Sequence, residues 1–228
     1  DADDTAVAVL LLHELGEAVD PTLLRRFELT ATGHFASFPY ERHSSVGVNL
    51  HVLHMLLRVP GYPDAPRVIG RILDYLVDQQ IDRLYWVDKW HISPYYATAH
   101  VLCVLDELPE AEAARVRPVV ERAREWVRQT QNTDGSWGFY GQSTIEETAY
   151  ALLALARGSA GRAGAPPLSP ADRRQCLAGL RFMRGALRAQ ARAGRAAEFP
   201  PLWIDKGLYT PTLVVRAVIE AAMLRTAR

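Results

Sequence analysis

The stretch EWVRQTQNTDGSWG, residues 125–138, indicates how the fold is built, because its pattern occurs twice in the chain. The segment YLVDQQIDRLYW, residues 75–86, aligns with residues 126–137 at a constant offset. An aromatic residue, a branched residue, a glutamine and a final tryptophan coincide in the two copies. Such self-similarity predicts a chain assembled from repeated helix pairs.

A very apolar segment with a common start follows each copy. TAHVLCVL begins at Thr98 and TAYALLAL at Thr148, while DDTAVAVLLL from Asp3 aligns with EETAYALLAL from Glu146. A weaker last copy contains Trp203. An apolar helix must be covered on all sides, whereas an amphipathic helix can face solvent. We therefore expect the pairs to close into a ring with the apolar helices inside, an all-α fold of the α/α toroid type.

Apolar residues at helical spacing support this fold class throughout the chain. The predicted helices cover residues 5–15, 46–58, 67–79, 97–108, 115–129, 147–158, 173–190 and 210–225. No segment shows the alternation of a β-strand. The stretch 158–172 is rich in Gly, Pro, Ala and Ser and predicts a flexible loop within a single domain, residues 1–228.

The composition excludes several classes of partner. The formal net charge is zero, so nothing indicates nucleic acid or an anionic membrane surface. No apolar run approaches the roughly 20 residues that span a bilayer, so we expect no stable membrane insertion. Cys103 and Cys176 lie in apolar stretches, which is typical of buried thiols in a reducing compartment and predicts a cytoplasmic location. Among 26 basic residues, only Lys89 and Lys206 are lysines.

Three carboxylates, Asp1, Asp3 and Asp4, stand directly before the first apolar run. An aspartate before a helix is an ordinary N-cap, but this role explains one acid and not three. A cluster of carboxylates could instead hold Mg²⁺, or it could hold an acid ready for chemistry.

Several motifs together resemble the terpene cyclases. Gln131, Gly135 and Trp137 are similar to the QW motif of that family, squalene–hopene cyclases included, and DADDTA, residues 1–6, resembles the DxDD motif of its class II members. Further similar stretches are FPYERHSSVGVNLHVL (38–53), WVDKWHISPYYATAH (86–100), DGSWGFYGQSTIEETAYALLAL (134–155) and LWIDKGLYTP (202–211). Together they cover the whole chain and look most like bacterial copalyl diphosphate synthases.

The resemblance implies a reaction that begins with protonation of an alkene. A class II diterpene cyclase would convert geranylgeranyl diphosphate into a copalyl-type bicyclic diphosphate, with ent-copalyl diphosphate as an example. Its acid must be neutral at the working pH, and both burial and neighbouring carboxylates raise the pKa of a carboxyl group. By resemblance, Asp3 donates the proton while Asp1 and Asp4 set its environment. The DDxxD spacing of class I metal sites is absent, because Thr5 and Ala6 follow the acids. We therefore expect no metal site in the chain, and Mg²⁺ assisting only through the diphosphate.

Asn49 lies on an apolar helix, where a buried amide needs hydrogen-bond partners. The resemblance implies that it hydrogen-bonds the catalytic acid, and the alternative is an amide that caps or bridges helices. His51 and His54 follow on the same helix. We interpret them as packing or surface histidines rather than as the base that ends the reaction.

The tetrapeptide pattern W-[VI]-D-K occurs at residues 86–89 and 203–206 and contains both lysines of the chain. A lysine is a compact point charge, so one hypothesis is that Lys89 and Lys206 bind the substrate diphosphate. The alternative is a structural Asp–Lys pair between adjacent repeats. Trp90 and Tyr95 are candidates for aromatic faces that stabilise a carbocation, although most aromatic residues in a helical barrel belong to the core.

The resemblance also implies missing parts. Relatives carry a second helical domain, γ, inserted before the DxDD helix, so we expect residues 1–228 to be a β domain incomplete at its N-terminus and inactive alone. The expected partners are geranylgeranyl diphosphate and the γ domain of the same protein. The alternatives are a class II cyclase acting on squalene or farnesyl diphosphate, and a non-catalytic toroid scaffold.

Overall fold

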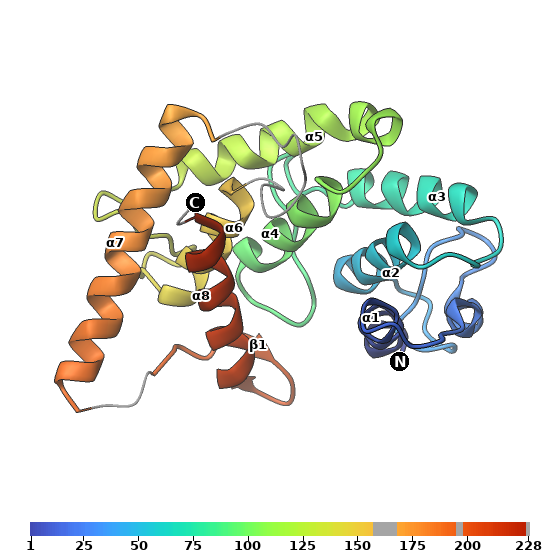
Figure 1. The fold of residues 1–228 in the computed structure, drawn as a ribbon, viewed down its shortest axis with the longest axis horizontal. Coiled ribbons are helices and arrows are strands. Elements are labelled where there is room, and N and C mark those ends of the chain that lie inside the picture. The colour runs from blue at the N-terminus through green and yellow to red at the C-terminus, as the bar shows by residue number, and fades with distance from the viewer. Residues whose placement is uncertain (157–167, 195–197, 227–228) are drawn as a thin grey trace. The chain divides into compact units, whose positions relative to one another are not determined.

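The computed structural model describes residues 1–156, 168–194 and 198–226, and its regular secondary structure is almost entirely helical (Figure 1). The chain divides into two compact units, of which unit 1 comprises residues 1–81 and 107–117 and unit 2 comprises residues 82–106 and 118–228. No helix in the described part of the chain is both long and apolar enough to cross a membrane.

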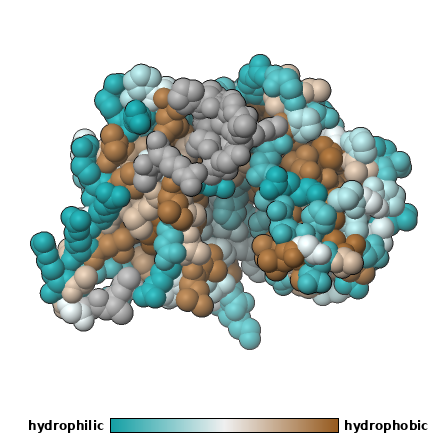
Figure 2. All heavy atoms as spheres, in the orientation of Figure 1, coloured by the Kyte–Doolittle hydropathy of each residue, from teal (hydrophilic) through white to brown (hydrophobic). Residues whose placement is uncertain are grey.

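Unit 1 is built around the packing of α1 on α2. Its elements are α1 (Ala2–Glu14), the 3-10 helix η1 (Pro21–Phe27), α2 (Val46–Arg58), α3 (Ala65–Asp78) and the first part of α5 (Glu110–Gln129). Helix α1 also packs on η1, and α2 packs on α3. The side chain of Ser45 begins α2 by accepting a hydrogen bond from the Val48 N–H. Leu11, Leu12 and Leu15, at the C-terminal end of α1, are exposed, and Figure 2 shows apolar residues at the surface there.

Unit 2 has α6 (Ile145–Leu155) at its centre, with every residue of this helix buried. Around it pack α4 (Pro94–Leu105), α7 (Pro170–Arg192) and α8 (Thr212–Thr226). The second part of α5 and a short hairpin, β1 (Trp203–Ile204) with β2 (Leu208–Tyr209), complete the unit. The outer face of α7 is hydrophilic in Figure 2, as expected of an amphipathic helix. The predicted division into apolar inner and amphipathic outer helices therefore holds for α6 and α7.

The sequence repeat corresponds to one recurring hydrogen bond. The backbone N–H of Trp86 donates to Thr98 Oγ1 at 3.0 Å, and that of Trp137 donates to Thr148 Oγ1 at 3.1 Å. Both threonines are fully buried near the start of an apolar helix. Each bond therefore joins a tryptophan-containing turn to the apolar helix that follows it.

The turn after α5 also connects that helix to α7. The Gln131 amide donates to the carbonyl oxygens of Gly135 and Gln175, at 2.9 and 3.0 Å. The indole N–H of Trp137 donates to the Val127 carbonyl at 2.8 Å. Since Gln175 lies on α7, one glutamine joins its own turn to α7.

Two sequence predictions need correction. The hairpin β1–β2 was not predicted, because strands of two residues are too short to display an alternating pattern. The predicted loop 158–172 extends too far, since residues 170–172 belong to α7. The Ser169 side chain caps this helix, and Pro170 suits its first turn. Residues 158–167 lie outside the described residues.

Both cysteines are free thiols in helices of unit 2. Burial raises the pKa of Cys103 to about 11 and that of Cys176 to about 12. Both side chains are therefore protonated and inert at neutral pH.

Gly135 and Gly141 form a matched pair for testing the turn after α5. Both have positive φ, +88° and +78°, but a Cβ on Gly135 would lie 2.8 Å from the Ala178 backbone, whereas one on Gly141 would meet nothing within 4 Å. Gly141→Ala should cost only the backbone strain of about 1–2 kcal/mol. Gly135→Ala should cost at least about 1 kcal/mol more, because packed backbone must move. Urea unfolding of both variants measures the difference, and equal losses would contradict the predicted clash.

Candidate active site

The three carboxylates at the start of the chain have different surroundings in unit 1. Asp1 is the N-cap of α1, and its side chain accepts a hydrogen bond from the Asp4 N–H at 2.9 Å. Asp1 and Asp4 are exposed, whereas the Asp3 side chain is 33% exposed. The N-cap role open in the sequence therefore applies to Asp1, and Asp3 is the acid that faces the protein.

Asp3 is paired with a histidine of α2. Its Oδ1 lies 2.7 Å from His51 Nδ1, and the ring of His51 is 22% exposed. His51 was interpreted from the sequence as a packing or surface histidine, because its position on α2 does not reveal what lies opposite. The packing of α1 on α2 brings it to the acid.

Asn49 acts on the backbone beside the acid rather than on the acid itself. Its Oδ1 accepts from the Phe35 N–H at 2.8 Å, and its Nδ2 donates to the carbonyl oxygens of Phe35 and Ser45, both at 2.9 Å. An amide nitrogen has two hydrogens, so both donors are used and the predicted bond to the acid is not formed here. These contacts fit the alternative named from the sequence, an amide that bridges neighbouring segments.

The hydrogen bonds of Asn49 are nevertheless linked to Asp3 through the backbone. Asn49 fixes Phe35, and two residues later the Ser37 carbonyl accepts a hydrogen bond from the Ala2 N–H at 2.9 Å. Ala2 is the first residue of α1 and directly precedes Asp3. Asn49 therefore helps to set where α1 begins.

The predicted binding residues lie in unit 2. Tyr95 is buried and stacks on Trp126 with ring centroids 4.8 Å apart, and burial raises its pKa to about 12. These are the surroundings of a core residue, the alternative left open by the sequence. Trp90 is 38% exposed, and Lys89 Nζ lies 5.0 Å from the centroid of its ring.

The two W-[VI]-D-K segments, far apart in sequence, are neighbours in space. The Ile204 N–H donates to the Trp90 carbonyl, and the Ile92 N–H donates to the Leu202 carbonyl, each at 2.9 Å. Strand β1 thus pairs with β2 on one side and with residues 90–92 on the other. Lys89 and Lys206 are both exposed, at the turns beside this small ladder.

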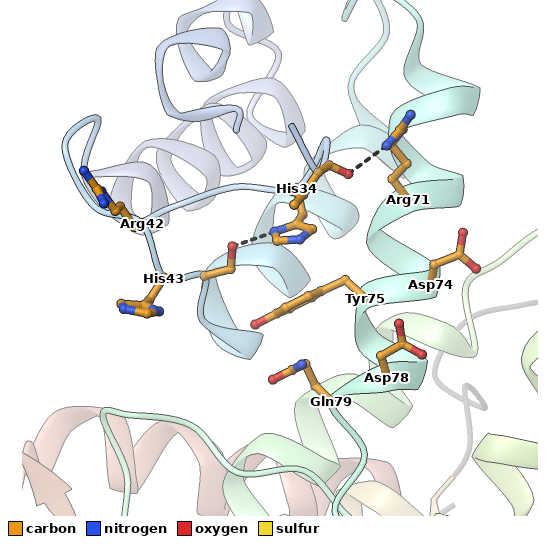
Figure 3. Close-up of a pocket in the computed structure, with 10 residues that line it drawn as sticks. His34, Arg42, His43, Arg71, Asp74, Tyr75, Asp78 and Gln79 are labelled. Carbon is orange, nitrogen blue, oxygen red and sulfur yellow. Dashed lines mark hydrogen bonds between the residues drawn. The ribbon is translucent and has the colours of Figure 1, made fainter. Parts of the chain in front are cut away.

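A polar pocket of about 570 Å³ lies elsewhere in unit 1, between α3 and residues 32–44 (Figure 3). His34 Nδ1 lies 2.6 Å from Ser44 Oγ, and the His34 ring packs on Tyr75 with centroids 4.5 Å apart. Arg71 donates to the Thr32 carbonyl at 3.0 Å. Burial lowers the pKa of His34, which favours the neutral ring. These bonds hold the segment on α3, and the pocket contains none of the predicted site residues.

A carboxylate metal site is not formed by the residues the structure describes. Among them, no three His, Cys, Asp or Glu side chains are grouped so that they could hold a metal ion. Asp1 is used as a helix cap, and Asp3 is paired with His51.

Comparison with known proteins identifies related sequences along the whole chain. Residues 41–169 match the family described as squalene-hopene cyclase C-terminal domain. A labda-7,13-dienyl diphosphate synthase from Streptomyces clavuligerus is 39% identical, covering 100% of this chain and 38% of the relative. An ent-copalyl diphosphate synthase from Streptomyces sp. strain KO-3988 is 37% identical, covering 100% of this chain and 41% of the relative. The chain spans about two fifths of the length of these relatives.

A solved structure has the same fold. The ent-copalyl diphosphate synthase from Streptomyces platensis matches with a TM-score of 0.80 and 35% identity, over 100% of this chain and 42% of that one. The predicted fold class, all-α and of the α/α toroid type found in terpene cyclases, is confirmed by this likeness.

The role found for Asn49 can be tested by two substitutions. Asn49→Leu should lower the free energy of unfolding by about 1–3 kcal/mol, because the Phe35 N–H and the Phe35 and Ser45 carbonyls lose a buried partner. Asn49→Asp keeps the acceptor but places a buried carboxylate oxygen against two carbonyl oxygens, so its loss should be at least as large. Urea unfolding measures both, with Asn132→Leu, an amide in a surface turn, as the control. A loss no larger than that of the control would contradict the bridging role.

Proposed function

Because the chain belongs to the squalene-hopene cyclase C-terminal domain family, we propose that it is the acid-bearing part of a class II diterpene cyclase. Relatives over the whole chain are named as synthases of copalyl-type and labdadienyl diphosphates. The observation that carries the proposal is the acid cluster at the start of α1, in which Asp3 is held against the His51 ring. We propose that residues 1–4 are the DxDD motif and residues 126–137 the QW motif of this family.

The proposed reaction is an isomerisation of geranylgeranyl diphosphate. A proton from Asp3 adds to the terminal alkene, and the alkene π electrons form the new C–H bond and leave a carbocation. Neighbouring double bonds then attack in turn and close two rings. Loss of a proton from the final cation restores a double bond, so one proton enters, one leaves, and the diphosphate stays intact in a copalyl-type product.

The surroundings of Asp3 support its role as the donor. Asp1 and Asp4 stand within the same helical turn, and Asp1 caps α1, which leaves Asp3 as the acid that faces the protein. His51 offers a ring nitrogen through which a proton can return to Asp3 after each turnover. Asn49 contributes indirectly, through the position of the start of α1.

Lys89 and Lys206 are proposed to bind the diphosphate that the reaction leaves intact. They are the two lysines of a chain otherwise rich in arginine, and their turns are joined by backbone hydrogen bonds. Trp90 is exposed beside Lys89 and can present an aromatic face to the carbocation. Tyr95 supports this surface from the core through its stacking on Trp126.

The proposal includes components outside the described residues. Mg²⁺, if used, is bound through the substrate diphosphate, and no step above depends on it. We propose that a γ domain of the same protein supplies the other wall of the cavity, in keeping with the partial coverage of the relatives. We also propose a cytoplasmic location for the enzyme, supported by the two free thiols.

Asp3→Asn should abolish cyclisation in the full-length protein, because an amide cannot donate an acidic proton to an alkene. The variant retains the size of the side chain and a polar contact with His51, so circular dichroism should be unchanged. Incubation with geranylgeranyl diphosphate followed by product analysis measures the loss. Glu14→Gln, an exposed acid at the other end of α1, is the control and should keep its activity. Normal turnover by Asp3→Asn would contradict the assignment of the donor.

Lys89→Ala and Lys206→Ala should each raise KM about tenfold or more, because a charge-assisted contact with the diphosphate contributes roughly 1.5–3 kcal/mol. Arg216→Ala removes an exposed positive charge from α8 and should leave KM unchanged. Steady-state kinetics and thermal unfolding of the three variants separate the two roles considered for the lysines. An unchanged KM with lower thermal stability would favour the structural Asp–Lys pair.

A further inference from the structure

A buried glutamate in unit 2 joins the two lysine-bearing turns. Glu146 is fully buried at the start of α6. Its Oε1 lies 2.8 Å from the indole Nε1 of Trp203 and 3.2 Å from His91 Nε2. Trp203 opens the second W-[VI]-D-K segment, and His91 stands two residues after Lys89. One carboxylate oxygen therefore contacts both turns.

Both contacts are hydrogen bonds donated to Glu146. The indole N–H of Trp203 can only donate. His91 Nδ1 accepts from the Ser93 N–H at 3.0 Å, the shorter of its two contacts with that residue, since the Ser93 carbonyl oxygen lies at 3.3 Å, and this arrangement leaves Nε2 to donate. The His91 ring thus directs its N–H at Glu146 Oε1.

Aromatic packing fixes the two donor rings. The His91 ring stacks on Tyr96, with centroids 4.7 Å apart and planes 12° apart. The Trp203 ring lies edge-on to both, 5.2 Å from the His91 ring and 5.0 Å from the Tyr96 ring. Tyr150 packs edge-on against His91 and Tyr96. Neither donor can rotate away from Glu146 without disturbing this cluster.

The other oxygen of this carboxyl group indicates what the group contributes. Glu146 Oε2 is buried and has no hydrogen-bond partner among the described residues. A buried polar atom without a partner costs roughly 1–3 kcal/mol, which an apolar side chain would avoid. The benefit of the carboxyl group must therefore come from Oε1 and the two turns it joins.

Glu146 also occupies the place of Asp3 in the sequence repeat. In EETA and DDTA these are the first acids, and each is paired with a histidine, His91 for Glu146 and His51 for Asp3. Asp3 is partly exposed, whereas Glu146 is enclosed. The same position thus holds an accessible acid in one copy and an internal hydrogen-bond acceptor in the other.

We propose that Glu146 is a positioning residue for diphosphate binding, holding the turns of Lys89 and Lys206 so that the two ammonium groups act on one diphosphate. This inference rests on the role proposed above for the two lysines. The backbone bonds between residues 90–92 and 202–204 set the register of the turns. Glu146 connects both turns to α6 through its hydrogen bonds with His91 and Trp203.

The test uses the full-length protein and inorganic diphosphate as the probe, with binding measured by calorimetry so that the result does not depend on turnover. Glu146→Met keeps the side-chain volume but removes the acceptor, and it should weaken diphosphate binding about tenfold while changing kcat little. Glu146→Gln keeps a carbonyl oxygen for both donors and should restore binding to within about twofold of the native value.

A double variant separates positioning from general loss of stability. If Glu146 acts through the lysines, Glu146→Met combined with Lys206→Ala should weaken binding by less than the product of the two single effects, because only the part of the Glu146 effect that acts through Lys89 remains. Glu147→Met is the matched control. Glu147 is also buried, but it bonds to Ser93, Phe139 and Thr144 instead of the hairpin. Its effect should add to that of Lys206→Ala.

The outcomes distinguish this inference from the proposed function. If the lysine variants weaken diphosphate binding but Glu146→Met does not, or if its effect adds fully to that of Lys206→Ala, only the positioning role is overturned. The same holds if Glu147→Met behaves like Glu146→Met. If neither lysine variant changes diphosphate binding, the lysine assignment fails and the positioning role falls with it. Failure to cyclise geranylgeranyl diphosphate would be seen separately, in the product assay.

Discussion

The hydrogen bond from a tryptophan backbone N–H to a buried threonine hydroxyl fixes the two central repeated units of the fold. It occurs between Trp86 and Thr98 and again between Trp137 and Thr148. A polar atom inside an apolar helix must find a partner, and here the partner is the preceding turn. The turn is thereby held at a set place on the apolar helix. The lysine turns and the buried glutamate depend on this placement, because Trp86 opens one lysine segment and Glu146 precedes Thr148 by one turn or less.

The two carboxylate positions of the repeat show how one scaffold serves two purposes. At Glu146 the acid is enclosed by rings and acts only as an acceptor. At Asp3 the acid lies at the edge of unit 1 and contacts a partly exposed histidine. Since the backbone environment repeats, the difference lies in what surrounds the side chain. The acid role proposed for Asp3 therefore requires access to the carboxyl group as well as its presence.

The helices and their repeats could be predicted from the sequence, because apolar spacing and the recurring Thr-Ala starts are local patterns. The contacts that define the site could not. His51 meets Asp3 only through the packing of α1 on α2, and Asn49 reaches the acid through the irregular segment at Phe35. Similarly, the pairing of the two lysine segments depends on strands too short to leave a periodic signal. For Glu146 the sequence did contain a usable pattern. Its alignment with Asp3 in the repeat predicts a second acid at the start of an apolar helix.

The protonated state of the two thiols affects how the protein can be labelled. Cys103 and Cys176 are the two cysteines of the chain, and burial keeps both protonated at neutral pH. Maleimides and other electrophiles react with the thiolate, so the native side chains should remain unmodified while the protein is folded. A cysteine introduced at an exposed turn would then take a fluorophore or spin label selectively. The native sequence thus already provides a silent background for spectroscopy of the lysine turns.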